Sequence, residues 1–171
     1  MAEDINHEID LYLLETFQVL LEHEVRKSRR YRYALTLVRI AVEAQPNNPK
    51  TQHAAEMVAI NALDSELRES DIPCRDGHEF FVLLPSTDEK GGRSTCQRLE
   101  KLLNTSSQTS EGVAFQSSAF IGLAGGYGGP SLSSIKLRQQ ACRAMEHARI
   151  HCFSNTVVFS EIVKSESDEA N

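Results

Sequence analysis

The sequence contains no tryptophan, and its four cysteines do not form a Cys-x-x-Cys pair. Cysteines scattered in this way are typical of buried free thiols in a reducing cytoplasm. No run of about 18 apolar residues is present, so no membrane-spanning helix is predicted. The net charge of −6 argues against a broad surface for nucleic acid or anionic membrane. We therefore expect a cytoplasmic protein with neither nucleic acid nor membrane as a partner.

The overall amino-acid composition is ordinary for a soluble domain. Of 171 residues, 40% are hydrophobic and 25% are charged, which is enough to bury one full core without disulfides. We predict a domain over 10–163, preceded by a flexible leader at 1–9 and followed by a disordered acidic tail at 164–171. The leader is acidic and lacks an apolar stretch, so no signal peptide is predicted.

Hydrophobic periodicity predicts four helices and a set of strands between them. Apolar residues recur every three to four positions in the predicted helices, and β-forming residues fill the predicted strands. The predicted helices are 10–32, 50–70, 86–103 and 131–151, and the predicted strands outside the central hairpin are 33–42, 113–124 and 156–159. Residues 104–112 are predicted to be a mobile polar loop and 125–130 a flexible glycine-rich connector. This order predicts a mostly antiparallel sheet flanked by helices.

The most informative stretch is Pro73–Pro85, which has the pattern of a β-hairpin. Asp76-Gly77 is a dipeptide that accepts positive φ at both turn positions. The run Phe80–Leu84 is apolar without alternation, so the strand is predicted to be buried on both faces beneath helices. The side chains of His78 and Glu79 follow the turn, where they can reach a cleft.

The tip of this hairpin, Asp76 to Phe80, resembles the signature of the GGDEF domain, the diguanylate cyclase family. That signature is Gly-Gly-(Asp/Glu)-Glu-Phe, followed by an apolar strand ending in Leu-Pro. Gly77, Glu79 and Phe80 match it, whereas the first glycine and the central acid are missing. Further stretches that resemble the family are 14–40, 67–103, 117–126 and 137–159. The resemblance implies an α/β (α+β) nucleotidyl cyclase palm with a ferredoxin-like core, in a bacterial signalling protein.

The resemblance also implies that catalysis has been lost. Active members carry Asp-x-Asp at the end of the first strand, where the first acid holds Mg²⁺; here that place reads Arg39-Ile40-Ala41. His78 replaces the central acid of the hairpin. Metal ions on a triphosphate need hard oxygen ligands, and a guanidinium would repel them or pair with Glu79. Glu43, the nearest acid, is expected on the wrong side of the strand end. We therefore expect no catalytic residues, no Mg²⁺ cofactor and no enzyme activity.

A ligand site is nevertheless implied by the family's product-inhibition motif, Arg-x-x-Asp before the hairpin. Arg68 and Asp71 match it, although Asp71 is one residue nearer the hairpin than usual, and Arg98 matches a second arginine on the following helix. The resemblance implies cyclic di-GMP as the ligand, bound as an intercalated dimer or shared between two chains. An ion pair at a helix end, worth under ~1 kcal/mol, is the plainer interpretation of Arg68 and Asp71.

Two other functions stay open from the sequence. One is a nucleotide-free scaffold or dimerisation module, with a homodimer or another protein as partner, and the less favoured one is an active cyclase. His147 and His151, with Cys152 beside them, have helical zinc-ligand spacing, but a third and fourth ligand are not evident, so an exposed polar face is favoured. Arg149 takes the place of a phosphate-binding lysine in the family.

Overall fold

The strand predicted from the apolar run lies near the centre of a seven-stranded sheet. The structure is a computed structural model that describes residues 11–151 and 156–169. In it, β4 (Glu79–Pro85) pairs antiparallel with β2 (Ala34–Gln45). On its other side, β2 pairs antiparallel with β6 (Ala114–Tyr127). β2 therefore has an antiparallel neighbour on each side.

Four shorter strands complete the sheet. β3 (Ile72–Asp76) forms the hairpin with β4, and the two-residue β1 (Tyr12–Leu13) runs parallel to β3. β5 (Ser106–Gln108) and β7 (Thr156–Val158) both pair with β6, the first antiparallel and the second parallel. Four of the six pairings among the described strands are antiparallel. The predicted fold class, a mostly antiparallel sheet with flanking helices, is confirmed.

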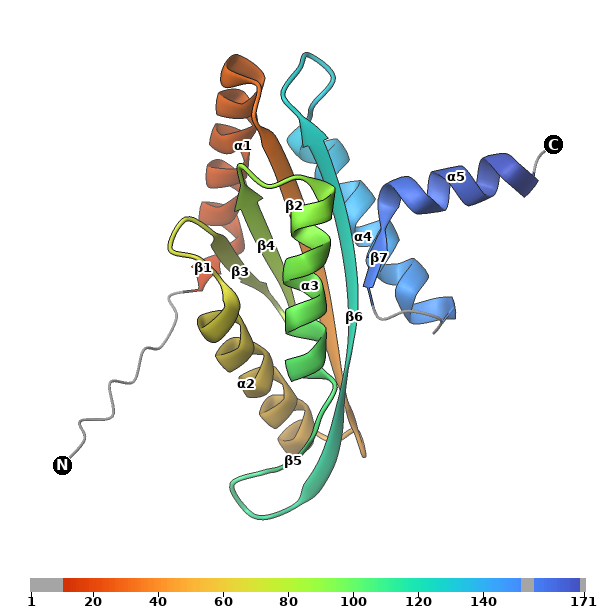
Figure 1. Ribbon diagram of the computed structural model, residues 1–171. Coiled ribbons are helices and arrows are strands. Elements are labelled where there is room, and N and C mark those ends of the chain that lie inside the picture. Colours follow the sequence, from red (N-terminus) through yellow and green to blue (C-terminus); the bar gives the residue numbers. More distant parts are fainter. Residues whose placement is uncertain (1–10, 152–155, 170–171) are drawn as a thin grey trace.

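Helices cover both faces of this sheet (Figure 1). α2 (Pro49–Glu66) and α3 (Glu89–Leu103) pack on one face, and their apolar side chains share a core cluster with the sheet. α1 (Leu14–Tyr31) and α4 (Ser134–His151) pack on the opposite face around a second cluster. Two layers of helices therefore enclose the central strands.

The sequence of β4 fits this double cover. Phe80, Val82 and Leu84 lie in the cluster beneath α2 and α3, while Phe81 and Leu83 lie in the cluster beneath α1 and α4. All five side chains are buried. Successive residues of a strand point to opposite faces, so a strand that is apolar at every position needs cover on both sides. The predicted burial on both faces is confirmed.

The hairpin turn lies one residue later than predicted. Gly77 has φ 63°, so its positive φ is confirmed, but Asp76 is the last residue of β3 and pairs with Glu79. The two turn residues are therefore Gly77 and His78. Asp76 stays in the strand because its carboxylate there reaches Arg39 of β2.

Four predicted helix boundaries are wrong by three or four residues. α3 begins at Glu89 rather than residue 86, because the side chain of Asp88 caps it by accepting from the Gly91 N–H. α1 begins at Leu14 rather than residue 10, because the preceding residues pair with β3. α2 ends at Glu66 rather than residue 70: the backbone N–H of Arg68 donates to the Asp71 side chain at 2.8 Å, which turns the chain into β3. α4 begins at Ser134, and the Ile135 side chain, expected in the core, is exposed.

Two segments predicted as loops contain strand. The polar stretch 104–112 includes β5, which pairs with the first three residues of β6, Ala114 to Gln116. The glycine-rich stretch predicted as a connector continues β6 as far as Tyr127, opposite the start of β2 at Ala34. The predicted strand 33–42 likewise continues to Gln45. A long antiparallel partner extends each of these strands, an effect that local composition does not reveal.

The C-terminal segment also differs from its prediction. The last predicted strand ends at Val158, and α5 (Phe159–Glu169) follows. The expected disordered tail is therefore helical over 164–169. Ile162 is buried, and Glu161 pairs with Arg93 of α3, so this helix is held against the domain despite its acidic composition. The predicted leader, 1–9, lies outside the described residues. No helix in the described chain has the length and apolar character to cross a membrane.

Candidate functional site

Arg39 is a buried cation at the hairpin. It lies on the face of β2 that α1 and α4 cover, and 8% of its surface is exposed. Its Nη1 donates to Asp76 Oδ2 at 2.8 Å, and its Nε donates to Glu79 Oε2 at 2.8 Å. The guanidinium carbon lies 4.1 Å from the centre of the Phe81 ring, a cation–π contact. Because a buried charge needs partners, the two hairpin carboxylates stabilise this arginine.

Arg149 of α4 extends the same network. Its Nη2 lies 3.2 Å from Glu79 Oε1, its Nε lies 3.3 Å from Glu43 Oε1, and its Nη1 lies 3.0 Å from Glu146 Oε1. Arg39 and Arg149 thus each hold one oxygen of Glu79. The hairpin charge cluster is defined here as Arg39, Glu43, Asp76, Glu79 and Arg149.

The position of Glu43 corrects the sequence-based expectation. Because β2 continues to Gln45, Glu43 lies inside the strand, four residues from Arg39 and on the same face. It is not beyond the strand end, and it contributes a carboxylate to the cluster. The predicted pairing of Arg39 with Glu79 is present.

The cluster is chemically poor as a magnesium site. Mg²⁺ requires near-octahedral oxygen ligands, and here both oxygens of Glu79 already face guanidinium groups. A divalent ion placed beside Arg39 would meet a like charge in a buried environment of low dielectric. Within residues 11–151 and 156–169, no three His, Cys, Asp or Glu side chains are grouped so that they could hold a metal ion.

His78 lies apart from this cluster. Its Nδ1 is 2.6 Å from Glu56 Oε1 of α2, and Arg75 pairs with the other oxygen of Glu56. The Glu56 side chain is 3% exposed, whereas that of His78 is 80% exposed. Of the three degenerate positions identified in the sequence, the structure therefore brings Arg39 and Glu79 together and directs His78 towards α2.

The predicted ligand residues Arg68 and Asp71 line one open cavity of about 380 Å³. We call it the Arg68 cavity. Its walls come from β2, β4, the first turns of α3 and the end of β6, and from the segments that join α2 to β3 and β4 to α3. The residues that line it are Ala34, Arg68, Asp71, Leu84, Ser86, Thr87, Asp88, Gly91, Thr95 and Tyr127.

Asp71 is held in place by the backbone. Its Oδ2 accepts from the Arg68 N–H at 2.8 Å, and its own N–H donates to the Arg68 carbonyl at 2.9 Å. Burial raises the pKa of the Asp71 carboxyl above its ordinary value, and the Arg68 hydrogen bond and the charges of Arg68 and Arg98 offset part of that rise. The side chains of Arg68 and Asp71 form no ion pair within the described chain, so the helix-end pair considered from the sequence is not present.

Arg98, the third predicted ligand residue, does not line the cavity. Its Nε donates to Glu66 Oε2 at 2.8 Å, and its Nη2 lies 3.5 Å from Thr95 Oγ1. Thr95 is one helical turn before Arg98 and does line the cavity. The guanidinium therefore lies beside the cavity, directed towards α2.

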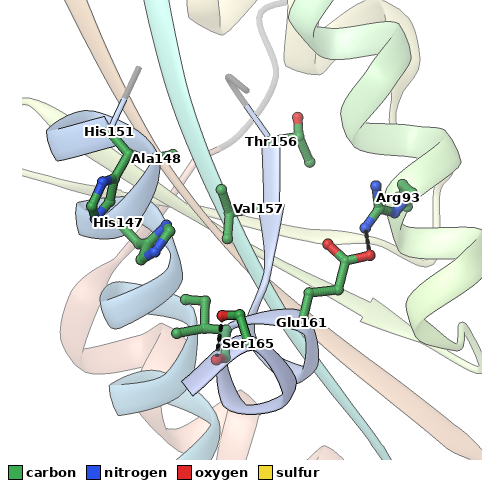
Figure 2. A pocket seen from close by; sticks show the side chains of 9 residues that line it. Arg93, His147, Ala148, His151, Thr156, Val157, Glu161 and Ser165 are labelled. Atoms are coloured by element: carbon green, nitrogen blue, oxygen red, sulfur yellow. Dashed lines mark hydrogen bonds and ion pairs between the residues drawn. The ribbon is translucent and has the colours of Figure 1, made fainter. Parts of the chain in front are cut away.

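A second cavity of about 320 Å³ lies between α3, α4, β7 and α5 (Figure 2). His147 and His151 of α4 lie on one side with ring centres 4.2 Å apart, and the Arg93–Glu161 ion pair lies on the other. No acid or cysteine in the described chain joins the two imidazoles as a metal ligand, and Cys152 lies outside the described residues. This cavity does not contain the residues predicted to carry function.

Comparison with solved structures identifies the fold. The GGDEF domain of DgcB from Caulobacter crescentus, solved in complex with c-di-GMP, superposes with a TM-score of 0.78 at 12% identity, over 87% of this chain and 89% of that one. The chain has the fold of a GGDEF domain. The FimX GGDEF domain from Pseudomonas aeruginosa gives a TM-score of 0.72 at 18% identity, over 86% and 94% of the two chains.

Another structure with the GGDEF fold shows a protein partner. Diguanylate cyclase SiaD from Pseudomonas aeruginosa, solved with its activator SiaC, gives a TM-score of 0.76 at 20% identity. The match covers 86% of this chain but 58% of SiaD. No protein-family sequence model matches this chain, and no curated protein matches it with significance. The likeness therefore rests on three-dimensional structure and on the motif positions.

Sequence reasoning did not identify Glu56, Asp76 or Tyr127 as residues at these sites. Glu56 lies on a helix 22 residues before its partner His78, and no local pattern connects them. The sequence pattern places Asp76 in the turn and Tyr127 in a flexible connector. Tyr127 lies opposite Ala34 at one end of the sheet. This position follows from the pairing of β6 with β2, which no local sequence pattern reveals.

Proposed function

We propose that this chain is a GGDEF-fold signalling domain that does not make cyclic di-GMP and that binds cyclic di-GMP in the Arg68 cavity. The observation that carries the first part is the engagement of both Glu79 oxygens by Arg39 and Arg149. The observation that supports the second part is the shared cavity of Arg68 and Asp71. The c-di-GMP complex of DgcB shows that a domain of this fold accommodates the ligand.

Loss of synthesis follows from the electrostatics of phosphoryl chemistry. Such enzymes work almost entirely by placing the substrate and neutralising the developing charge, and metal ions supply much of that neutralisation. In this chain the hairpin acids neutralise arginines instead. Arg39 contacts two carboxylates and an aromatic ring. A metal ion that took its place would leave the buried guanidinium without its partners, which is energetically costly.

Incubation with GTP and Mg²⁺ or Mn²⁺, followed by chromatography, tests this part. We expect no cyclic di-GMP. Turnover of about 1 per second, an ordinary enzyme rate, would contradict the proposal.

Ligand binding is supported by the chemistry of the cavity residues. The guanidinium of Arg68 can donate a planar pair of hydrogen bonds to a phosphate or to the Hoogsteen edge of guanine. Asp71 can accept hydrogen bonds from guanine N1 and N2. Arg98 lies beside the cavity, and a rotation away from Glu66 would bring a second cation towards the ligand.

Matched variants test the binding site. We expect Arg68→Ala to abolish cyclic di-GMP binding, because it removes the cation that lines the cavity. His78→Ala is the control, because His78 contacts Glu56 at the opposite end of the hairpin. Equilibrium dialysis with labelled cyclic di-GMP measures both variants. Equal affinity of Arg68→Ala and the wild type would refute the assignment of this cavity.

A nucleotide-free protein-interaction module is the second candidate. Two observations favour it: Arg98 is already paired with Glu66, and the cavity contains two carboxylates, Asp71 and Asp88. The partnership of SiaD with SiaC supports a protein partner for this fold. If the wild-type chain binds no cyclic di-GMP, this second function becomes the better account.

A further inference from the structure

Tyr127 is an aromatic side chain at the mouth of a polar cavity. It is the last residue of β6, lies directly opposite Ala34 of β2, and lines the same cavity as Arg68 and Asp71. It is 69% exposed, although large aromatic side chains are usually more deeply buried. Its hydroxyl lies 3.4 Å from Asp88 Oδ2, the cap of α3. One edge of the ring is therefore positioned while most of its surface remains accessible.

The wall that carries Tyr127 is built by a close approach of α3 to the sheet. A Cβ on Gly92 of α3 would lie 2.7 Å from Thr36 Cγ2, and a Cβ on Gly125 of β6 would lie 2.7 Å from Glu89 Cγ. The missing side chains allow the first turn of α3 to pack on β2 and β6. Thr36 Oγ1 then donates to the Thr87 carbonyl at 2.8 Å, which fixes the segment between β4 and α3.

We propose that Tyr127 stacks on a guanine base held in the Arg68 cavity. The inference rests on the proposed function, that this cavity binds cyclic di-GMP. A volume of about 380 Å³ is at the low end for a small-molecule site, so the cavity accommodates one base and leaves the rest of the dinucleotide outside. Stacking on an aromatic ring is a general mode of base recognition and requires an accessible ring face, which Tyr127 offers.

The hydrogen-bonding groups of the cavity favour guanine over adenine. The Watson–Crick edge of guanine presents two adjacent N–H donors, which match one carboxylate. Adenine presents an acceptor at N1, which would face the same carboxylate unfavourably. Asp71 is the carboxylate that the backbone of Arg68 holds in the cavity. Tyr127 then supplies affinity for the base by stacking on it, and Asp71 supplies the preference for guanine.

Tyrosine fluorescence tests the stacking directly, because the chain has no tryptophan and four tyrosines. Cyclic di-GMP should quench the wild-type signal after correction for ligand absorbance, and cyclic di-AMP should not. Tyr127→Phe should keep the calorimetric affinity but lose most of the quenching. Tyr127→Ala should bind about 10-fold more weakly, since the stacked ring is removed. Tyr31→Phe, which changes an exposed tyrosine of α1 outside the cavity, should keep both affinity and quenching.

The results separate this inference from the proposed function. If wild-type protein shows no binding heat with cyclic di-GMP, both fail. If it binds, but Tyr127→Ala binds equally well or Tyr127→Phe retains full quenching, the stacking role is overturned while the proposed function stands. Equal quenching by cyclic di-AMP would overturn the guanine preference.

Discussion

Replacing Arg39 by methionine removes the positive charge of the hairpin charge cluster's central residue while keeping a long, flexible side chain. In the native chain the Arg39 side chain is 10% exposed and holds Asp76 and Glu79, which are 34% and 25% exposed. The substitution leaves Asp76 without its cation, whereas Glu79 keeps Arg149 at 3.2 Å. The two carboxylates then lie close together in a partly buried site.

The expected loss of stability follows from the burial. Removing one partner of a buried ion pair typically costs about 3–5 kcal/mol, because the other charge remains uncompensated. The partial exposure of both acids and the retained Arg149 contact place Arg39→Met at the low end, about 3 kcal/mol. Loss of the cation–π contact with Phe81, worth about 0.5–2 kcal/mol, acts in the same direction.

Urea denaturation followed by far-UV circular dichroism measures the change. Arg143→Met is the matched control, because Arg143 and its partner Glu166 are each 55% exposed, and such pairs contribute under about 1 kcal/mol. When Asp76 is also replaced by asparagine, Arg39→Met should lower the free energy of unfolding by less, because the Asp76 carboxylate is no longer left without a cation. If Arg39→Met were no more destabilising than Arg143→Met, the ion pairs of Arg39 would not stabilise the fold as a buried network does.

Three further predictions concern the hairpin and the cysteines. Gly77→Val should lower the free energy of unfolding by about 1–2 kcal/mol through strain at positive φ, whereas Gly129→Val, at an open position without positive φ, should be nearly neutral in a thermal melt. Phe80→Ala should cost about 3–5 kcal/mol because the ring is fully buried, and a melt matching that of exposed Leu13→Ala would contradict this. Burial raises the pKa of the Cys74 thiol to about 11 and of Cys96 to about 12. The pKa of each thiol is higher in the folded chain than the ordinary value of 9.0. The contribution of these protonated thiols to the stability of the fold is therefore complete below pH 9 and declines as the pH rises towards 11–12. Alkylation at pH 8, mapped by mass spectrometry, should therefore spare both thiols until urea is added, and rapid labelling of the native chain would refute their burial.

The fold could be predicted from local patterns because the central elements obey them strongly. Phe80–Leu84 is apolar at every position, which requires cover on both faces, and Gly77 is the residue that tolerates the turn. The pairing of Arg39 with Glu79 was predictable because the positions that resemble the family place Arg39 on the strand beside the hairpin that carries Glu79. These features depend on neighbours close in sequence or on a strong motif.

Other features depend on contacts between distant elements. The glycine-rich end of β6 has the composition of a connector, and only its pairing with Ala34 makes it a strand that presents Tyr127. The acidic C-terminal helix has the composition of a disordered tail, and Ile162 and the Arg93–Glu161 pair keep it in place. The ion pair that turns Arg98 towards Glu66 joins two helices, so the motif alone could not show it.

We propose that this GGDEF-fold chain has a cyclic di-GMP site at Arg68 and Asp71. Calorimetric titration of the purified wild-type chain with cyclic di-GMP is its most direct test. The account predicts a saturable heat that disappears in Arg68→Ala. Absence of heat from the wild type at high micromolar ligand would contradict it.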